Sequence, residues 1–168
     1  MRYTPAAMAL SLLLAVTASA SWSAQTEPMN RQAGALLVQG RTALASGNVD
    51  SATDAFEAAL AVQPGHPTIL LALADATRRH GMQGKAIHYY RRALEADPAN
   101  VMAIAGEGAA LVEKGAVERA RRNLSRLEGL CGSSCEATRL LASAIEKGPT
   151  PRVITAEAVT PKPAVSEN

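Results

Sequence analysis

The chain has 168 residues, enough for one domain of moderate size, and its formal net charge is +2. This near-neutral balance argues against a strongly electrostatic partner such as duplex nucleic acid. Aromatic residues make up 3% of the chain and alanine is abundant, a composition that suits close helix–helix packing better than the core of a sheet.

Residues 1–20 have the pattern of a secretory signal peptide. Arg2 supplies a positive start, Ala6 to Val16 is an apolar run, and Ala18-Ser19-Ala20 gives a small–x–small cleavage site. Cleavage after Ala24 is a weaker alternative, because it places the bulky Trp22 in a slot for a small residue. An uncleaved membrane anchor is a second alternative, but the run is short of the roughly 20 apolar residues that a spanning helix needs.

Cleavage of this signal predicts a secreted mature protein with no stable membrane insertion. The bacterial periplasm is the compartment we expect, and its oxidising conditions allow cysteines to pair.

A repeat with a period of 34 residues organises the middle of the chain. One such step carries Pro98 onto Pro64 and Gly81 onto Gly47. Each copy holds two apolar runs at helical spacing that are separated by a glycine turn, and this pattern is typical of a helical solenoid. The predicted repeats span residues 33–66, 67–100 and 101–132, after a disordered lead-in at residues 21–30.

Equivalent positions of the repeats carry residues of similar volume. We expect small residues where the two helices of a repeat approach closely, and larger ones that fill the space between repeats. The small residues are Gly40, Ala74 and Gly108 on the first helices and Ala52, Ala86 and Ala120 on the second, and the larger ones are Phe56, Tyr90 and Leu124.

The third repeat departs from the pattern of the other two. Glu107 stands where a large apolar residue is expected, as does Gln39 in the first repeat, whereas Leu73 conforms. Leu127 replaces a small residue, and Gly132 occupies the place of the terminal proline.

Residues 134–147 predict an amphipathic helix that caps the open end of the solenoid. Apolar residues recur there at the spacing of one helical face, and a solenoid needs such a cap to cover its last apolar surface. Residues 148–168 contain several prolines and little apolar periodicity, so we expect a disordered tail. The apolar face consists of Ala137, Leu140, Leu141, Ala144 and Ile145.

The repeats resemble the tetratricopeptide repeat (TPR) family, most closely in residues 67–98. That resemblance implies an all-α, right-handed solenoid of three helix–turn–helix repeats plus the cap helix. It also implies a concave groove, formed by the first helix of each repeat, that holds a peptide or a partner helix. Carried over position by position, the groove residues are Leu37, Arg41, Leu44, Leu71, Asp75, Arg78, Ala105, Ala109 and Val112, with Thr68 and Met102 beside them.

The groove is mostly apolar, with Arg41 and Arg78 as its basic points, so we expect a ligand that combines an apolar segment with an acidic residue. Some family members clamp a C-terminal carboxylate with a Lys/Asn pairing, which is not matched here. A receptor for chaperone tails is therefore disfavoured.

Cys131 and Cys135 are the cysteines of the chain, and they lie between the third repeat and the cap helix. Behind a signal peptide, the expected state is a structural disulfide that closes a short turn. A redox-active pair is the alternative, although the spacing differs from the two-residue motif and no thioredoxin-like pattern surrounds it. Two thiols alone are too few ligands for a metal site.

No motif of a known active site is present. The sequence lacks a Gly-rich phosphate loop, HExxH and GxSxG, and His66, His80 and His88 fall in different predicted elements. We therefore expect no enzymatic activity, no metal and no cofactor.

The sequence hypothesis is a periplasmic protein-interaction scaffold, active in cell-envelope assembly or secretion, with a protein or peptide partner. The alternative is a thiol redox or metal-handling protein that uses Cys131 and Cys135. A further possibility is a homo-oligomer formed through the uncapped face of the first repeat.

Overall fold

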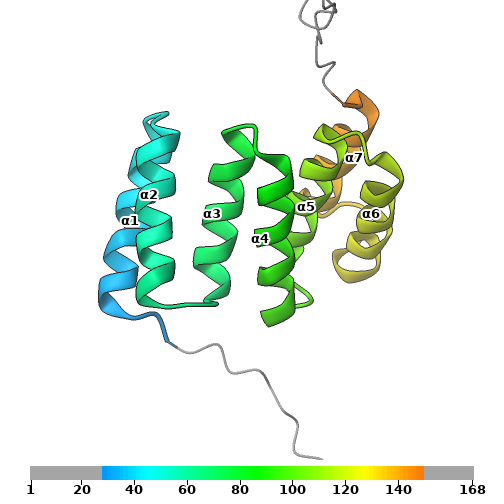
Figure 1. Ribbon diagram of the computed structural model, residues 1–168. Coiled ribbons are helices and arrows are strands. Elements are labelled where there is room, and N and C mark those ends of the chain that lie inside the picture. Colours follow the sequence, from blue (N-terminus) through cyan, green and yellow to red (C-terminus); the bar gives the residue numbers. More distant parts are fainter. Residues whose placement is uncertain (1–27, 150–168) are drawn as a thin grey trace, which may run out of the picture.

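The computed structural model describes residues 28–149, which contain seven α-helices and no strand (Figure 1). The predicted signal peptide, most of the lead-in and the tail from residue 150 lie outside the described residues. The expected all-α solenoid of three helix pairs and a final helix is confirmed. The helices are α1 (Arg31–Ala45), α2 (Val49–Val62), α3 (Pro67–Arg79), α4 (Gln83–Ala96), α5 (Val101–Glu113), α6 (Val117–Cys131) and α7 (Glu136–Lys147).

The 34-residue period reappears in the turns inside the repeats. Gly47, Gly81 and Gly115 have φ angles of 81°, 82° and 85°, a backbone region that glycine adopts without steric cost. The starts of α2 and α5 are also specified locally. At Asn48 and Asn100, the side-chain oxygen accepts a hydrogen bond from a backbone N–H of the first turn, as expected for an N-cap.

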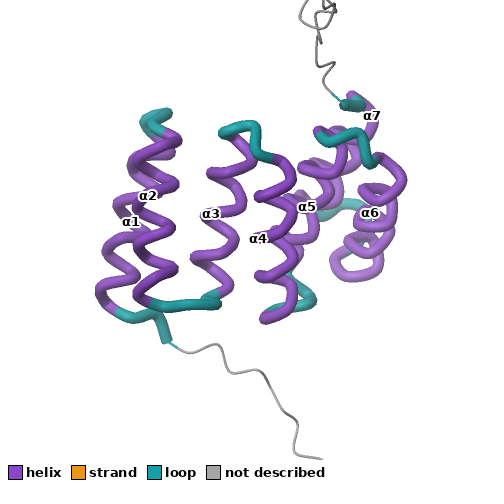
Figure 2. The backbone as a smooth tube through the Cα atoms, in the orientation of Figure 1, coloured by secondary structure: helices purple, strands orange, loops and turns teal. Residues whose placement is uncertain are grey.

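The helices stand side by side in chain order, and the loops alternate between the two ends of the solenoid (Figure 2). The first helices α1, α3 and α5 pack on one another in sequence, whereas the second helices α2, α4 and α6 make no close backbone contact with each other. The first helices therefore form a tighter inner face, and the second helices spread apart on an outer face.

The predicted small residues admit close packing as expected in the first repeat. Gly40 lies against the ring of Phe56, and a Cβ atom at Gly40 would come within 2.3 Å of it. Gly108 has a different neighbour. A Cβ atom there would meet the side chain of Leu141 at 2.6 Å, so this glycine admits the cap helix α7. The partner-helix residues Ala52, Ala86 and Ala120 are completely buried.

The N-terminal end of the described chain is held against the first repeat. The Gln63 side chain accepts a hydrogen bond from the Asn30 amide at 2.8 Å and donates one to the Pro28 carbonyl at 3.2 Å. Met29 packs against the core between α1 and α3. Pro28, Met29 and Asn30 fall within the stretch expected to be a disordered lead-in, and their contacts fix the start of α1.

Helix α7 packs on α5 and α6 and covers the last apolar face. Ala137, Thr138 and Leu141 are its buried residues. Leu140 was part of the predicted buried face, but it is 57% exposed. The helix is therefore turned so that Leu140 points away from the core.

Cys131 ends α6, and Cys135 immediately precedes α7. Their sulfur atoms lie at disulfide-bonding distance and their Cα atoms are 5.7 Å apart. The Thr138 hydroxyl donates a hydrogen bond to the Gly132 carbonyl at 2.9 Å, so the first turn of α7 is tied to the same loop.

None of the helices within residues 28–149 is long and apolar enough to cross a membrane.

Candidate binding groove

A cavity of about 440 Å³ lies on the inner face, where the first helices of the three repeats meet the cap helix α7. Side chains from α1, α3, α5 and α7 form most of its wall, and the largest inward residues of α2 and α4, Phe56 and Tyr90, reach it from behind. The repeat spacing explains this convergence, because one position per turn of each first helix faces the same side.

Most of the residues predicted from the family resemblance line this cavity. They come from all three repeats, and Thr68 and Met102 join them. The predicted residues that line it are Arg41, Leu44, Leu71, Asp75, Arg78, Ala105 and Ala109.

Leu37 and Val112 do not belong to this surface, and their placement corrects the predicted set. Leu37 is 5% exposed and packs in the core with Phe56. Val112 is 2% exposed and lies in the core cluster that includes Leu141 of α7. Each lies at an end of the repeat array, where neighbouring segments cover a position that stays accessible in the central repeat.

The cap helix supplies groove residues that the repeat pattern does not reveal. Leu140 and Leu141 both contribute to the wall, and Leu140 is the more exposed of the two. Met102 of α5, which also lines the groove, is 56% exposed. The apolar spacing of the cap helix was visible in the sequence, but its rotation on α5 was not.

Arg78 lies in the groove, but its charge is already compensated. Its Nη1 atom is 2.6 Å from Glu113 Oε1, and its Nη2 atom is 3.3 Å from Asp75 Oδ1. Burial alone would lower the pKa of Arg78, but the nearby Tyr90, Glu113 and Asp75 outweigh it and raise the pKa. Asp75 also accepts from Arg79 at 2.9 Å, so two arginines and two carboxylates form one balanced network.

Tyr90 stays neutral behind this network. Burial raises its pKa to about 12, with a further increase from Asp75 and an opposing effect of Arg78. Its ring lies directly over Gly106, where a Cβ atom would come within 2.4 Å of it. The phenol thus backs the groove as an uncharged surface.

Arg41 is the basic group that remains available to a ligand. It is exposed on α1 at the groove wall, and within residues 28–149 it forms no ion pair with a carboxylate. An apolar groove with one uncompensated cation at its rim can bind an apolar side chain and a carboxylate together.

The described residues hold no candidate metal centre. Across residues 28–149, no three His, Cys, Asp or Glu side chains are grouped so that they could bind a metal ion.

Comparison with known proteins supports the expected resemblance to tetratricopeptide repeat proteins. Residues 37–101 match a tetratricopeptide repeat family model. No curated protein sequence resembles the chain closely enough to count as a relative.

Solved structures of similar fold include the first TPR of Spaghetti (RPAP3) bound to the HSP90 peptide SRMEEVD, with 22% identity over 69% of this chain and 92% of that one and a TM-score of 0.63. The Sgt2 TPR domain from Aspergillus fumigatus has 22% identity over 83% and 89% of the two chains, with a TM-score of 0.63. A Thermobaculum terrenum O-GlcNAc transferase has 28% identity over 68% of this chain but 22% of its own, with a TM-score of 0.62.

The stacked helix pairs and the groove on their inner face define a helical-repeat scaffold of the kind that binds other proteins. Residues 37–101 match the tetratricopeptide repeat family, and the described helices have the fold of tetratricopeptide repeat domains. Such an array is typically non-catalytic, although the transferase shows that it also occurs within an enzyme.

Proposed function

We propose that this protein binds a peptide or a partner helix in the groove between α1, α3, α5 and α7. The observation that carries the proposal is the cavity of about 440 Å³, whose wall is mostly apolar and includes the exposed side chains of Met102 and Leu140. Large apolar side chains at half-open positions cost solubility unless a partner covers them.

The charges of the groove narrow the chemistry of the ligand. Arg78 is engaged by Glu113 and Asp75, so a ligand would have to displace these carboxylates to use it. Arg41 has no such competitor within the described chain. We infer that the ligand carries a large apolar side chain close to one acidic residue, and that Arg41 meets this acidic residue.

A related fold supports peptide binding as the mode of action. The first TPR of Spaghetti (RPAP3) was solved with the acidic HSP90 peptide SRMEEVD. Because the Lys/Asn carboxylate pairing is not matched in this chain, the proposal is an internal acidic and apolar segment and not a C-terminal tail.

The proposed site of action is the bacterial periplasm, in cell-envelope assembly or secretion. The signal-like pattern of residues 1–20 supports export. The geometry of Cys131 and Cys135 suits a structural disulfide in an oxidising compartment. We expect neither cysteine to react with iodoacetamide, by mass spectrometry, until a reductant is added; bound metal or free thiols in the purified protein would favour the thiol-based alternative.

Selection from a library of phage-displayed peptides tests the groove directly. We expect the mature protein to enrich sequences that place Asp or Glu near a large apolar residue. Arg41→Glu should instead enrich Lys or Arg at the same place, because the charge at the rim is reversed.

The matched control is Arg139→Glu, which makes the same charge change at an exposed residue of α7 outside the groove lining. This variant should select the same peptides as the unaltered protein. Enrichment of one common set by all three proteins would show that the groove is not the binding site.

A further inference from the structure

A second cleft lies on the outer face of the solenoid, between α4 and α6, with a volume of about 440 Å³. It exists because the second helices do not pack on each other, so residues of α5 are left as its floor. Basic residues dominate its walls. The polar groups that line it are Arg91, Glu107, Arg119, Arg122, Asn123 and Arg126, with Glu95 at its edge.

Glu107 forms the polar floor of this cleft and is 7% exposed. Its Oε1 atom accepts from Arg91 Nε at 2.8 Å, and its Oε2 atom accepts from Asn123 Nδ2 at 3.1 Å. Asn123 also donates to the Ile104 carbonyl at 3.2 Å. Each oxygen of the buried carboxylate is therefore bonded to one of the two walls, and the carboxylate holds Arg91 and Asn123 in position.

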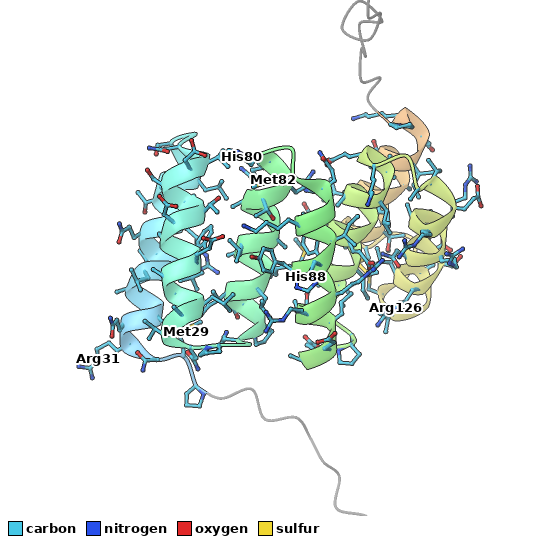
Figure 3. All side chains as sticks on the ribbon, viewed as in Figure 1. Met29, Arg31, His80, Met82, His88 and Arg126 are labelled. Atoms are coloured by element: carbon cyan, nitrogen blue, oxygen red, sulfur yellow. A yellow bond between two sulfur atoms is a disulfide. The ribbon has the colours of Figure 1, made fainter. Side chains whose placement is uncertain are left out.

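The remaining arginines keep most of their donors free. Arg119 and Arg122 form no ion pair within residues 28–149, and Arg126 donates to the Pro98 carbonyl. Arg91 uses Nε on Glu107, which leaves its two terminal nitrogens. Figure 3 shows Arg126 and His88 on the side of the molecule that carries α4 and α6.

The cleft has an excess of positive charge. Four arginines oppose two glutamates, which leaves a formal charge of +2 in a chain whose total is also +2. Of the two glutamates, Glu107 already accepts a hydrogen bond at each oxygen. Guanidinium groups on two facing walls, with Arg91 held in place by Glu107, are suited to bidentate recognition of oxyanions.

We propose that the cleft between α4 and α6 is a second binding site, and that it takes an acidic peptide segment of a partner protein. Carboxylate side chains of the segment pair with Arg119 and Arg122 on one wall and Arg91 on the other. This site is independent of the inner groove, so one protein of this kind can hold two segments at once.

The residues of the cleft favour carboxylates of a peptide over phosphate groups of a membrane or a free ion. Glu95 and Glu107 lie among the arginines and repel a densely charged headgroup more than a dispersed row of carboxylates. Leu94 and Leu111 contribute apolar surface, which suits side chains of a peptide.

Fluorescence anisotropy with a labelled, end-blocked peptide of alternating Glu and Ala tests the proposal on the full mature chain, because this peptide lacks the large apolar side chain expected of a ligand of the inner groove. We expect binding that weakens on adding salt and that is absent when Gln replaces Glu in the peptide. Arg119→Gln/Arg122→Gln should weaken binding by about tenfold or more, since a hydrogen bond to a charged group contributes about 1.5–3 kcal/mol.

The control variant Arg121→Gln/Arg139→Gln removes the same number of charges from exposed positions outside the cleft and should bind as the unaltered protein does. Equal affinity of the cleft variant and its control would overturn the proposal. Tighter binding of inorganic phosphate or of vesicles containing anionic phospholipid, lost in the cleft variant, would overturn the peptide assignment in favour of a phosphate site.

Discussion

The outer junctions between α2 and α4 and between α4 and α6 lie one repeat apart and are built from equivalent positions, yet they differ in character. Between α2 and α4, Lys85 Nζ lies 2.8 Å from Glu57 Oε1 and bridges the two walls. Beneath this pair, Leu73 is completely buried and Tyr89 packs on the same cluster. Between α4 and α6, the floor is the carboxylate of Glu107 and the walls are arginines.

The difference consists of a small number of coordinated changes at a spacing of 34 residues. Several polar or charged residues of the cleft between α4 and α6 take the place of apolar, aromatic, acidic or smaller basic residues one repeat earlier. The corresponding pairs are Leu73 and Glu107, Tyr89 and Asn123, Glu57 and Arg91, Lys85 and Arg119, and His88 and Arg122.

This comparison shows when a repeat slot can exchange an apolar residue for a carboxylate. A buried carboxylate costs several kcal/mol unless hydrogen-bond donors meet it. Glu107 is tolerated because Arg91 and Asn123 change together with it. Glu107, Arg91 and Asn123 thus form one hydrogen-bonded unit, and Arg91 contributes to the basic surface of the cleft.

The largest loss of stability is expected when a glutamate is placed at Leu73, the position one repeat before Glu107. Leu73→Glu buries a carboxylate in the cluster on which Tyr89 packs. Glu57 stands there at the position equivalent to Arg91, and Lys85 is already paired with Glu57. We expect a loss of about 3–5 kcal/mol in the free energy of unfolding, the usual cost of an uncompensated buried charge. Urea denaturation followed by circular dichroism measures it.

The reverse exchange is the control for this prediction. Glu107→Leu restores the apolar residue of the second repeat, and the half-exposed Arg91 returns to water. Its effect on stability should stay within about 1.5 kcal/mol, because an apolar replacement of a buried ionic group is often neutral. If Leu73→Glu and Glu107→Leu destabilise the protein equally, the neighbouring side chains do not determine whether a carboxylate is tolerated at this repeat position.

Sequence alone predicted the helical repeats and which core positions are small, because these depend on period and volume, but it did not show that Gly108 admits the cap helix. It also located Glu107 as a departure. It could not show that Arg91 and Asn123 compensate that charge, since both come from second helices distant in sequence. The pairing requires the spacing of the helices in three dimensions.

The inner groove was predictable in its centre and not at its ends. Leu71, Asp75 and Arg78 lie where the repeat register places them, since neighbours on both sides are repeats. Leu37 and Val112 are covered because Met29 and the cap helix pack at the two ends. Ion pairing also redistributes the charges, so that Arg78 is compensated whereas Arg41 is not.

The interface behind the groove provides a second contrast between the repeats, because Tyr90 is followed one period later by Leu124. A buried phenol with a pKa raised to about 12 must stay protonated in the folded state. Unfolded tyrosine ionises near pH 10, so this stability is complete below pH 10 and declines as the pH rises to 12. We expect a total loss of about 2–3 kcal/mol.

Tyr90→Phe isolates this contribution. Lys85 also has a raised pKa, first because of its hydrogen bond to Glu57, but this contribution is common to both proteins and cancels in their difference. The difference in unfolding free energy between the two proteins, measured in urea from pH 9 to pH 12, should therefore change with pH in favour of the variant. A constant difference would mean that Tyr90 is not shielded from solvent.

The smallest of these effects concerns the contact between Tyr90 and the next repeat. A methyl group added at Gly106 would lie 2.4 Å from the Tyr90 ring, so Gly106→Ala forces the ring or helix α5 to move. Overpacking costs about 1–3 kcal/mol, and the better helix propensity of alanine offsets about 0.5–1 kcal/mol of it. We expect a net loss of about 1 kcal/mol in urea denaturation.

Gly129→Ala is the matched control, because no atom lies within 4 Å of its added methyl group, and it should stabilise the protein by the propensity term alone. If both variants gain stability, Tyr90 yields freely, and the second and third repeats are joined less tightly than their close contact implies.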